Sequence, residues 1–198
     1  IYLDSAASAQ KPDAVLDAMT GLARTSYANV HRGLHTLANE TTEAYEKARE
    51  TIARFINADV NEIVYTKSAT EAVNLVADTF GRSLKAGDEI VLSEMEHHAN
   101  IVPWHFLRER YGVVLKFVPV LDDGRLDMEA YEGLLSEKTK MVAVTHMSNV
   151  LGTVNDVTTI VRLAHAAGAP VLLDGCQGIV HTKVDVKALN VDYYVFSG

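Results

Sequence analysis

The chain has 198 residues, of which 48% are hydrophobic and 22% are charged, so it can bury a substantial core and is typical of folded globular proteins rather than disordered ones. Its formal net charge of −8 and the lack of a basic stripe argue against nucleic acid as the main partner. No apolar run reaches the length of about 20 residues that spans a bilayer, so we expect no membrane partner.

The cysteine count indicates the compartment. Cys176 is the single cysteine, which excludes an internal disulfide framework and is typical of a reducing environment, so we expect a cytoplasmic protein. No signal peptide opens the chain. Because the first residue is Ile1 and not Met, we expect that a few residues or a targeting segment precede it.

The first part of the chain, residues 1–60, is predicted to be an N-terminal helical segment that packs on the following domain or on a dimer partner. Residues 13–27 form one predicted helix and residues 41–56 a second. The second prediction depends on four side chains that recur at helical spacing: Tyr45, Ala48, Ile52 and Phe55.

Strands and helices alternate from residue 61 to residue 198, which predicts an α/β domain with a mostly parallel sheet. The expected strands are residues 62–66, 88–93, 113–120, 140–146, 170–174 and 192–197. The expected helices are residues 70–81, 100–111, 127–135 and 156–168. Several strands are nearly continuous apolar runs, so helices should cover both faces of the sheet. Ligands of such sheets bind beyond the carboxyl ends of the strands, where functional residues should therefore lie.

The segment after the first predicted strand indicates an anion site. Ser68 and Glu71 have the spacing of a capping box, so a helix should begin near Ala69 and Thr70 with unpaired backbone N–H groups. A helix N-terminus binds anions, and Thr70 adds a hydroxyl group. The alternative is an ordinary capped helix without a ligand. No P-loop or G-x-G-x-x-G motif follows any strand, which argues against nucleotide folds of those types.

Two further strand ends carry polar side chains. His97 and His98 follow the second strand; adjacent residues of an extended segment point in opposite directions, so they should not share a metal ion. His97 could stack on a planar ligand, or it could be a loop histidine. A metal site at "EMEHH" lacks any standard ligand spacing. Asn149, after the fourth strand, can both donate and accept hydrogen bonds, and its alternative is plain turn chemistry beside Gly152.

The last two strands end in a carboxylate and a hydroxyl. Asp174 follows a buried strand, and a buried carboxylate stays ionised only where a positive or donating group faces it; a protonated pyridine nitrogen would serve. Its alternative is a turn or cap residue. Gln177 can donate to a ligand oxygen, and Ser197 ends the last strand. Cys176 has no base beside it and is interpreted as a structural residue. Together these groups favour a planar, phosphorylated ring as the ligand.

Seven segments, in order, carry a resemblance to a known family: "YLDSAASAQKP", "NVHRGLHTLA", "SATEAVNLVA", "MEHHANIVPW", "THMSNVLGT", "LLDGCQG" and "DYYVFSG". The chain closely resembles cysteine desulfurases of the class V aminotransferase family, in the branch that mobilises sulfur for iron–sulfur cluster assembly. The resemblance covers all 198 residues and about the first half of a family member. It implies an aspartate-aminotransferase-like large domain that binds pyridoxal 5′-phosphate (PLP).

The resemblance also implies a role for each candidate residue. Ala69, Thr70 and Ser197 would hold the cofactor phosphate. His97 would stack on the pyridine ring, Asp174 would pair with the ring nitrogen, and Gln177 would bond the phenolic oxygen. The substrate side would involve Asn149 and His31, the latter across a dimer interface. The catalytic residues within the chain would be His97, Asp174 and Gln177. Family members usually have alanine at position 176, so Cys176 is a departure of similar size.

The family's cofactor-binding lysine and its persulfide-carrying cysteine are expected beyond Gly198, so the chain alone is predicted to be inactive. The implied intact enzyme converts L-cysteine to L-alanine and a persulfide, acts as a homodimer, and passes sulfur to an acceptor or scaffold protein of iron–sulfur assembly. Selenocysteine lyase, kynureninase or an epimerase of the same superfamily stays an alternative, with L-selenocysteine as a second substrate. A non-catalytic PLP-binding fragment is the alternative of another class.

Overall fold

The computed structural model describes residues 1–198, which form two compact units, residues 1–64 and residues 65–198. The first unit contains helix α1 (Asp13–Thr25), helix α2 (Thr36–Ile56) and the short 3₁₀ helix η1 (Val60–Glu62). Both predicted helices are confirmed, but α2 begins at Thr36 and not at residue 41. The earlier start has a local cause, because Nδ1 of His35 accepts a hydrogen bond from the Ala38 N–H (3.3 Å) and caps the helix.

Helix α1 buries none of its side chains within the described chain. Four of its apolar residues are exposed: Val15, Leu16, Met19 and Leu22. The packing of residues 1–60 on the domain or on a dimer partner stays a prediction. No helix of either unit is long and apolar enough to cross a membrane.

The predicted strand at residues 62–66 is wrong. Residues 60–62 form η1, and the following segment pairs with no strand. The carbonyl of Ile63 accepts a hydrogen bond from the Arg49 guanidinium, and the side chain of Val64 is 69% exposed. A short apolar run becomes a strand only where a neighbouring strand hydrogen bonds to its backbone. Here the Arg49 side chain forms a hydrogen bond to the backbone instead.

The second unit is built on a five-stranded sheet with the order β2-β1-β3-β4-β5. All neighbouring pairs are parallel, which confirms the predicted sheet. The strands are β1 (Glu89–Ser93), β2 (Val114–Val118), β3 (Thr139–Thr145), β4 (Val171–Asp174) and β5 (Tyr193–Val195). Each lies within or one residue outside its predicted range.

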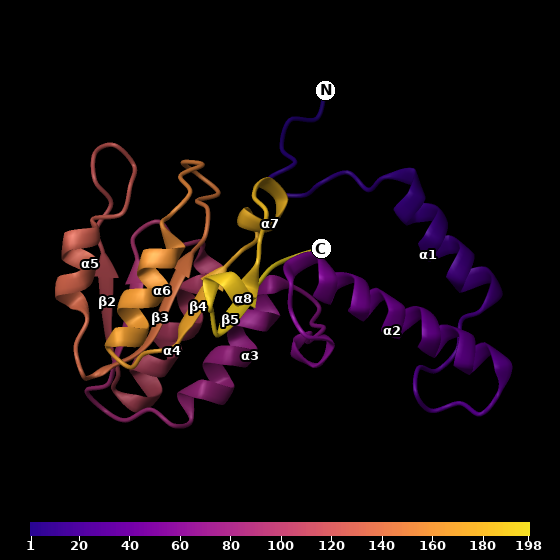
Figure 1. The fold of residues 1–198 in the computed structure, drawn as a ribbon, viewed down its shortest axis with the longest axis horizontal. Helices are drawn as coiled ribbons and strands as arrows, with labels where there is room; N and C mark the ends of the chain where they lie inside the picture. The colour runs from indigo at the N-terminus through magenta and orange to yellow at the C-terminus, as the bar shows by residue number, and fades with distance from the viewer. The chain divides into compact units, whose positions relative to one another are not determined.

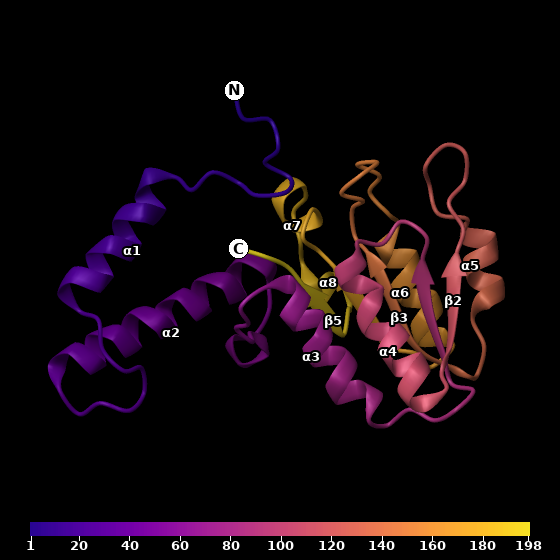
Figure 2. The ribbon, with the colours of Figure 1, turned by 180° about the vertical axis from the view of Figure 1, so that it is seen from behind.

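Helices cover both faces of this sheet, as predicted. Helices α3 (Ala69–Gly81) and α4 (Val102–Tyr111) pack on one face, while α5 (Met128–Leu134), α6 (Val157–Ala166) and α8 (Val186–Leu189) pack on the other (Figures 1 and 2). The 3₁₀ helix η2 (His98–Asn100) precedes α4, and the single-turn helix α7 (Gly178–His181) follows β4. Neither α7 nor α8 is among the predicted helices, because four residues are too few to show a helical period.

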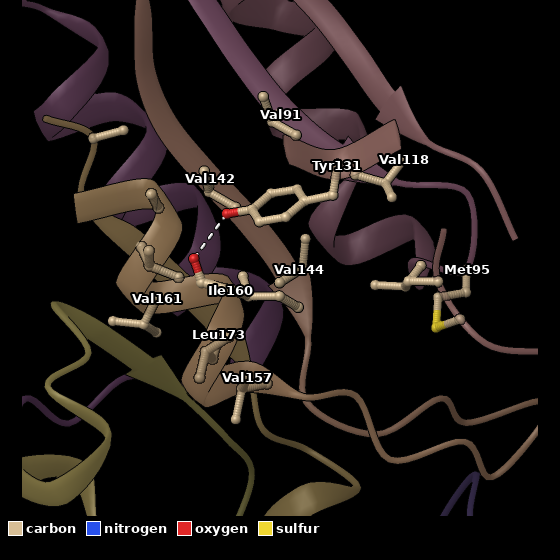
Figure 3. Packing of buried hydrophobic residues seen from close by; sticks show 14 residues of the cluster. Val91, Met95, Val118, Tyr131, Val142, Val144, Val157, Ile160, Val161 and Leu173 are labelled. Carbon is tan, nitrogen blue, oxygen red and sulfur yellow. Dashed lines mark hydrogen bonds between the residues drawn. The ribbon is translucent and has the colours of Figure 1, made fainter. Parts of the chain in front are cut away.

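Successive side chains of the strands enter two separate cores. Val91 packs beneath α5 and α6, whereas its neighbours Ile90 and Leu92 pack beneath α3 and α4. In the first core the Tyr131 hydroxyl donates to the carbonyl of Ile160 (2.8 Å), so its one polar group is satisfied (Figure 3). Burial on both faces explains why these strands are apolar without alternation.

Buried polar residues of the second unit gather at the carboxyl edge of the sheet. They are Ser93, Glu96, Asn100, Thr145, His146, Ser148, Asn155 and Asp174. Thr139, at the start of β3, is the exception. A buried polar group is costly without a partner, so a cluster of them at one edge marks the place where the fold is organised for a purpose other than packing.

Candidate functional site

Asp174 is the last residue of β4 and is held from both sides. It is the register partner of Thr145 in β3 and of Val195 in β5. The pairing continues past the strand, because the His146 N–H donates to the Asp174 carbonyl (2.8 Å) and the Gly175 N–H donates to the Val195 carbonyl (2.7 Å). The backbone of Asp174 therefore has a fixed position at the carboxyl edge.

The carboxylate of Asp174 is buried, with only 6% of the residue exposed, and forms no ion pair with any Lys, Arg or His side chain. Its Oδ1 accepts a hydrogen bond from the Cys176 N–H (3.1 Å). Burial is the main cause that raises the pKa of Glu96 and of Tyr194, and the charge of Asp174 adds to both rises. The charge is thus uncompensated within the chain, which suits a cationic group of a ligand.

Two glycines allow the loop after β4 to lie against aromatic side chains. A Cβ atom at Gly175 would be 2.2 Å from the ring of Tyr194, and one at Gly178 would be 2.6 Å from Nδ1 of His146. His146 Nδ1 and the Tyr194 hydroxyl are hydrogen bonded (2.9 Å). Only glycine permits this close approach, so the loop that carries Asp174 and Gln177 rests on a fixed aromatic support.

Cys176 is half-buried between Asp174 and Ser197, both of which hydrogen bond to it. Burial, followed by the Asp174 charge, raises the pKa of the thiol to about 12. The thiol is therefore protonated at neutral pH and is a poor nucleophile, in line with its interpretation as a structural residue. The contacts also bring Ser197, an exposed residue, to the same side of the sheet as Asp174.

The N-terminus of α3 has the predicted cap. Ser68 Oγ accepts a hydrogen bond from the Glu71 N–H (3.1 Å), and the Ser68 carbonyl accepts one from the Ala72 N–H (3.1 Å). Glu71 differs from a strict capping box, because its carboxylate accepts from the N–H of Lys67 and not from that of Ser68. The first two N–H groups of the helix, those of Ala69 and Thr70, remain available to an anion.

His97 lies beyond β1 and caps η2, where its Nδ1 accepts a hydrogen bond from the Ala99 N–H (3.2 Å). Its ring is exposed, and η2 contacts α3. The preceding residue, Glu96, is buried; burial is the main cause that raises the pKa of its carboxyl group to about 7. No group of three or more His, Cys, Asp or Glu side chains is arranged to hold a metal ion.

The remaining candidates occupy different places. Gln177 precedes α7 and is half-buried, and Asn149 is exposed in the turn after β3, where the Ser148 N–H donates to the Thr153 carbonyl (2.9 Å). His31 belongs to the first unit: it has a left-handed backbone (φ 65°), and its Nε2 lies 3.0 Å from Oε1 of Glu46. The roles of these residues toward a ligand stay predictions.

Sequence reasoning missed three residues of this edge: Glu96, His146 and Tyr194. Glu96 stands in the segment "MEHHAN", where metal-ligand spacing is the obvious pattern to look for, although a carboxylate beside a strand end is a signal in its own right. His146 and Tyr194 are 48 residues apart, and nothing local to either shows that they meet.

Known proteins similar to this chain agree on one family. The family model described as "Aminotransferase class-V" matches residues 1–198. A curated cysteine desulfurase of Dickeya dadantii (strain 3937) is 53% identical over 199 residues, which take in 100% of this chain and 48% of that protein. The chain spans about half the length of the curated relatives it matches.

Solved structures confirm the predicted fold. An apo cysteine desulfurase from Thermococcus onnurineus NA1 is similar with a TM-score of 0.95 and 39% identity, over 100% of this chain and 49% of that one. The cysteine desulfurase CsdA from Escherichia coli is similar with a TM-score of 0.90 and 40% identity, over 99% of this chain and 50% of that one.

Proposed function

Because the chain belongs to the aminotransferase class-V family, whose members use PLP, we propose that it forms the cofactor-binding part of a cysteine desulfurase. Such an enzyme converts L-cysteine to L-alanine and leaves the sulfur as an enzyme-bound persulfide. The observation that carries the proposal is the buried carboxylate of Asp174, which has no cation partner within the chain. The names of the relatives support cysteine as the substrate.

The groups at the carboxyl edge fit PLP on chemical grounds. The N–H groups of Ala69 and Thr70 at the start of α3, with the Thr70 hydroxyl, would hold the phosphate. Ser197 would add a hydroxyl from the end of β5. The uncompensated carboxylate of Asp174 would hold a proton on the pyridine nitrogen. When bound, the cofactor supplies an electron sink for negative charge at the substrate's α-carbon.

The other residues orient the ring and the substrate. The exposed imidazole of His97 would stack on one face of the ring, and the amide of Gln177 would donate to its phenolic oxygen. Asn149 would lie near that oxygen and the substrate carboxylate, with His31 on the substrate side. The thiol that accepts sulfur is not Cys176, since burial and the Asp174 charge keep this thiol protonated.

The test uses the full-length protein that contains this chain. Incubation with L-cysteine and a reductant should release L-alanine and sulfide in equal amounts, and the purified protein should show the visible absorption of bound PLP. PLP absorption without alanine formation would contradict the desulfurase activity. Parallel assays with L-selenocysteine and with kynurenine separate the proposal from selenocysteine lyase and kynureninase, which share the same cofactor site.

We further infer a cytoplasmic homodimer that transfers sulfur to an acceptor or scaffold protein of iron–sulfur cluster assembly. The single cysteine of the chain supports a reducing compartment. The resemblance to the sulfur-mobilisation branch supports the acceptor. Light scattering of the full-length protein should give twice the mass of one chain, and a monomer would contradict the dimer.

A further inference from the structure

Glu96 is a buried carboxyl group for which the proposed function gives no role. It precedes His97 in the chain, and only 9% of the residue is exposed. Its Oε1 accepts hydrogen bonds from the hydroxyl of Ser93 and from the Thr145 N–H (2.8 Å), and its Oε2 accepts one from the side-chain amide of Asn100 (2.7 Å). Three donors thus surround one carboxylate, and none of them is a cation.

These donors come from three elements that meet at the carboxyl edge. Ser93 ends β1, Thr145 ends β3 and Asn100 belongs to η2. Thr145 is the register partner of Asp174. The Glu96 carboxylate therefore connects the loop that carries His97 to β3, the strand next to the one that ends at Asp174.

The direction of each hydrogen bond is fixed. The indole N–H of Trp104 can only donate, and it donates to Oδ1 of Asn100 (3.0 Å), so the Asn100 amide presents its NH₂ group to Glu96. The backbone N–H of Thr145 is also a donor only. Ser93 Oγ accepts from the Met95 N–H (3.3 Å), which leaves its own proton for Glu96. The arrangement is complementary to the ionised carboxylate, which accepts on both oxygens, so the measurements below are made at pH 8, above the raised pKa of this group.

We propose that Glu96 is a positioning residue whose carboxylate fixes His97 relative to Asp174. The proposal rests on the proposed function, because the two residues matter as a pair only if they bind the same ring. The ring of His97 is exposed, and its hydrogen bonds run only to its own turn: Nδ1 accepts from Ala99 and the carbonyl accepts from Asn100 (2.8 Å). The position of His97 is therefore set by the hydrogen bonds of Glu96, the residue that precedes it.

The test reverses the polarity of one hydrogen bond in the full-length protein. Glu96→Gln leaves an amide that meets the Asn100 NH₂ group or, turned over, the Thr145 N–H, so one donor always faces another. Asn100→Asp places a second carboxylate against Glu96. In the double variant the amide introduced at position 96 donates to the carboxylate introduced at position 100, whose other oxygen accepts from Trp104, and the pattern is complementary again.

Two measurements report on the position of His97 independently of turnover. The first is the affinity for added PLP, together with the circular dichroism of the bound cofactor. The second is hydrogen exchange of residues 97–101 in the cofactor-free protein. Each single variant should bind PLP about tenfold more weakly, with altered dichroism and faster exchange, because a buried polar group loses its partner. The double variant should return to within about threefold of the wild-type affinity.

Glu94→Gln is the matched control, since Glu94 is an exposed glutamate of the same loop and its Oε2 accepts only from the Val120 N–H (3.3 Å). It should leave affinity, dichroism and exchange unchanged. Wild-type PLP affinity and exchange in Glu96→Gln would overturn the proposal, as would a double variant no better than the single ones. If the wild-type protein binds no PLP, the proposed function fails, and the exchange measurement still decides whether Glu96 holds the segment.

Discussion

The two edges of the sheet differ in how they hold a carboxylate: Glu89 at the amino edge is half-buried and paired, whereas Glu96 and Asp174 at the carboxyl edge are buried and unpaired. At the amino edge, Oε2 of Glu89 accepts hydrogen bonds from Lys116 Nζ (2.7 Å) and from the Ser136 hydroxyl (2.6 Å), and Lys116 also donates to the Leu134 carbonyl (2.9 Å). Burial acts to raise the pKa of Glu89, but the hydrogen bonds from Lys116 and Ser136 and the Lys116 charge together lower it. The chain provides its own counter-charge there.

At the carboxyl edge, Glu96 and Asp174 are both buried and neither forms an ion pair. Burial raises the pKa of Glu96 to about 7, and the charge of Asp174 adds to that rise. A fold that pairs its carboxylate at one edge could do so at the other. The pairing at the amino edge suits stability, whereas the unpaired carboxylate of Asp174 at the carboxyl edge fits the proposed function, in which the ligand brings the positive charge.

Asp174→Asn should have the largest effect on turnover. Because an amide cannot balance the charge of a protonated ring nitrogen, we expect kcat for L-cysteine to fall by at least about a hundredfold, with a smaller change in PLP affinity. The cofactor-free variant should unfold at the same temperature as the wild type or a higher one, since an uncompensated buried charge is removed. Steady-state kinetics and thermal unfolding of the full-length protein measure both quantities.

Cys176→Ala is the control for that experiment, because it alters a neighbour of Asp174 without changing its charge. Its turnover should stay within about threefold of the wild-type value, as expected for a side chain that fills space. Near-normal turnover of Asp174→Asn would remove the role proposed for the carboxylate.

The glycines of the β4–α7 loop offer the next test. Gly175→Ala should lower the free energy of unfolding by about 2 to 3 kcal/mol, because the added methyl group overlaps the Tyr194 ring. Gly133→Ala is the matched control: a Cβ there meets nothing within 4 Å, and the residue lies in α5. Its stability should be unchanged or rise by about 0.5 kcal/mol. Equal stabilities of the two variants in urea unfolding would argue against the tight loop.

Lys116→Met tests the amino edge. It leaves the Glu89 carboxylate with Ser136 alone, so we expect a loss of about 1 to 2 kcal/mol of stability, measured by urea unfolding. PLP affinity should not change, since this pair lies at the opposite end of the strands. Weaker PLP binding in this variant would mean that the two edges are not independent.

The amino-acid sequence predicts the second unit well because its signals are local. Continuous apolar runs such as residues 170–174 indicate strands covered on both faces, and the capping pattern of Ser68 locates the start of α3. Parallel strands share one carboxyl edge, so the side chains that follow the strands can be assigned to that edge from the order of the elements alone. Cys176, Asp174 and Ser197 are indeed together there.

The misses have a common cause, since they depend on contacts distant in sequence. Residues 62–66 have the pattern of a strand, but whether a strand forms depends on a neighbour that accepts its backbone. Glu96 differs from other acidic loop residues only through the N–H of Thr145, which lies 49 positions along the chain. The His146–Tyr194 pair and the glycines packed against it are likewise visible only in three dimensions.

The smallest expected effect is a difference between Glu96 and Glu89 in how their contributions to stability depend on pH. The pKa of Glu96 is raised from 4.5 to about 7 in the folded protein, so its contribution to stability is present below pH 4.5 and is lost as the pH rises through about 7. The pKa of Glu89 is lowered, so its contribution is present above its ordinary value of 4.5 and is lost as the pH falls below it.

Replacing each glutamate by glutamine in the cofactor-free protein should expose these opposite signs. The stability of the wild type minus that of Glu96→Gln should fall between pH 4.5 and 7, whereas the same difference for Glu89→Gln should be flat there and fall only in more acidic solution. Urea unfolding across this pH range makes the measurement. Parallel curves for Glu96→Gln and Glu89→Gln would mean that the two edges balance their charges alike, and the contrast from which the ligand site is inferred would be lost.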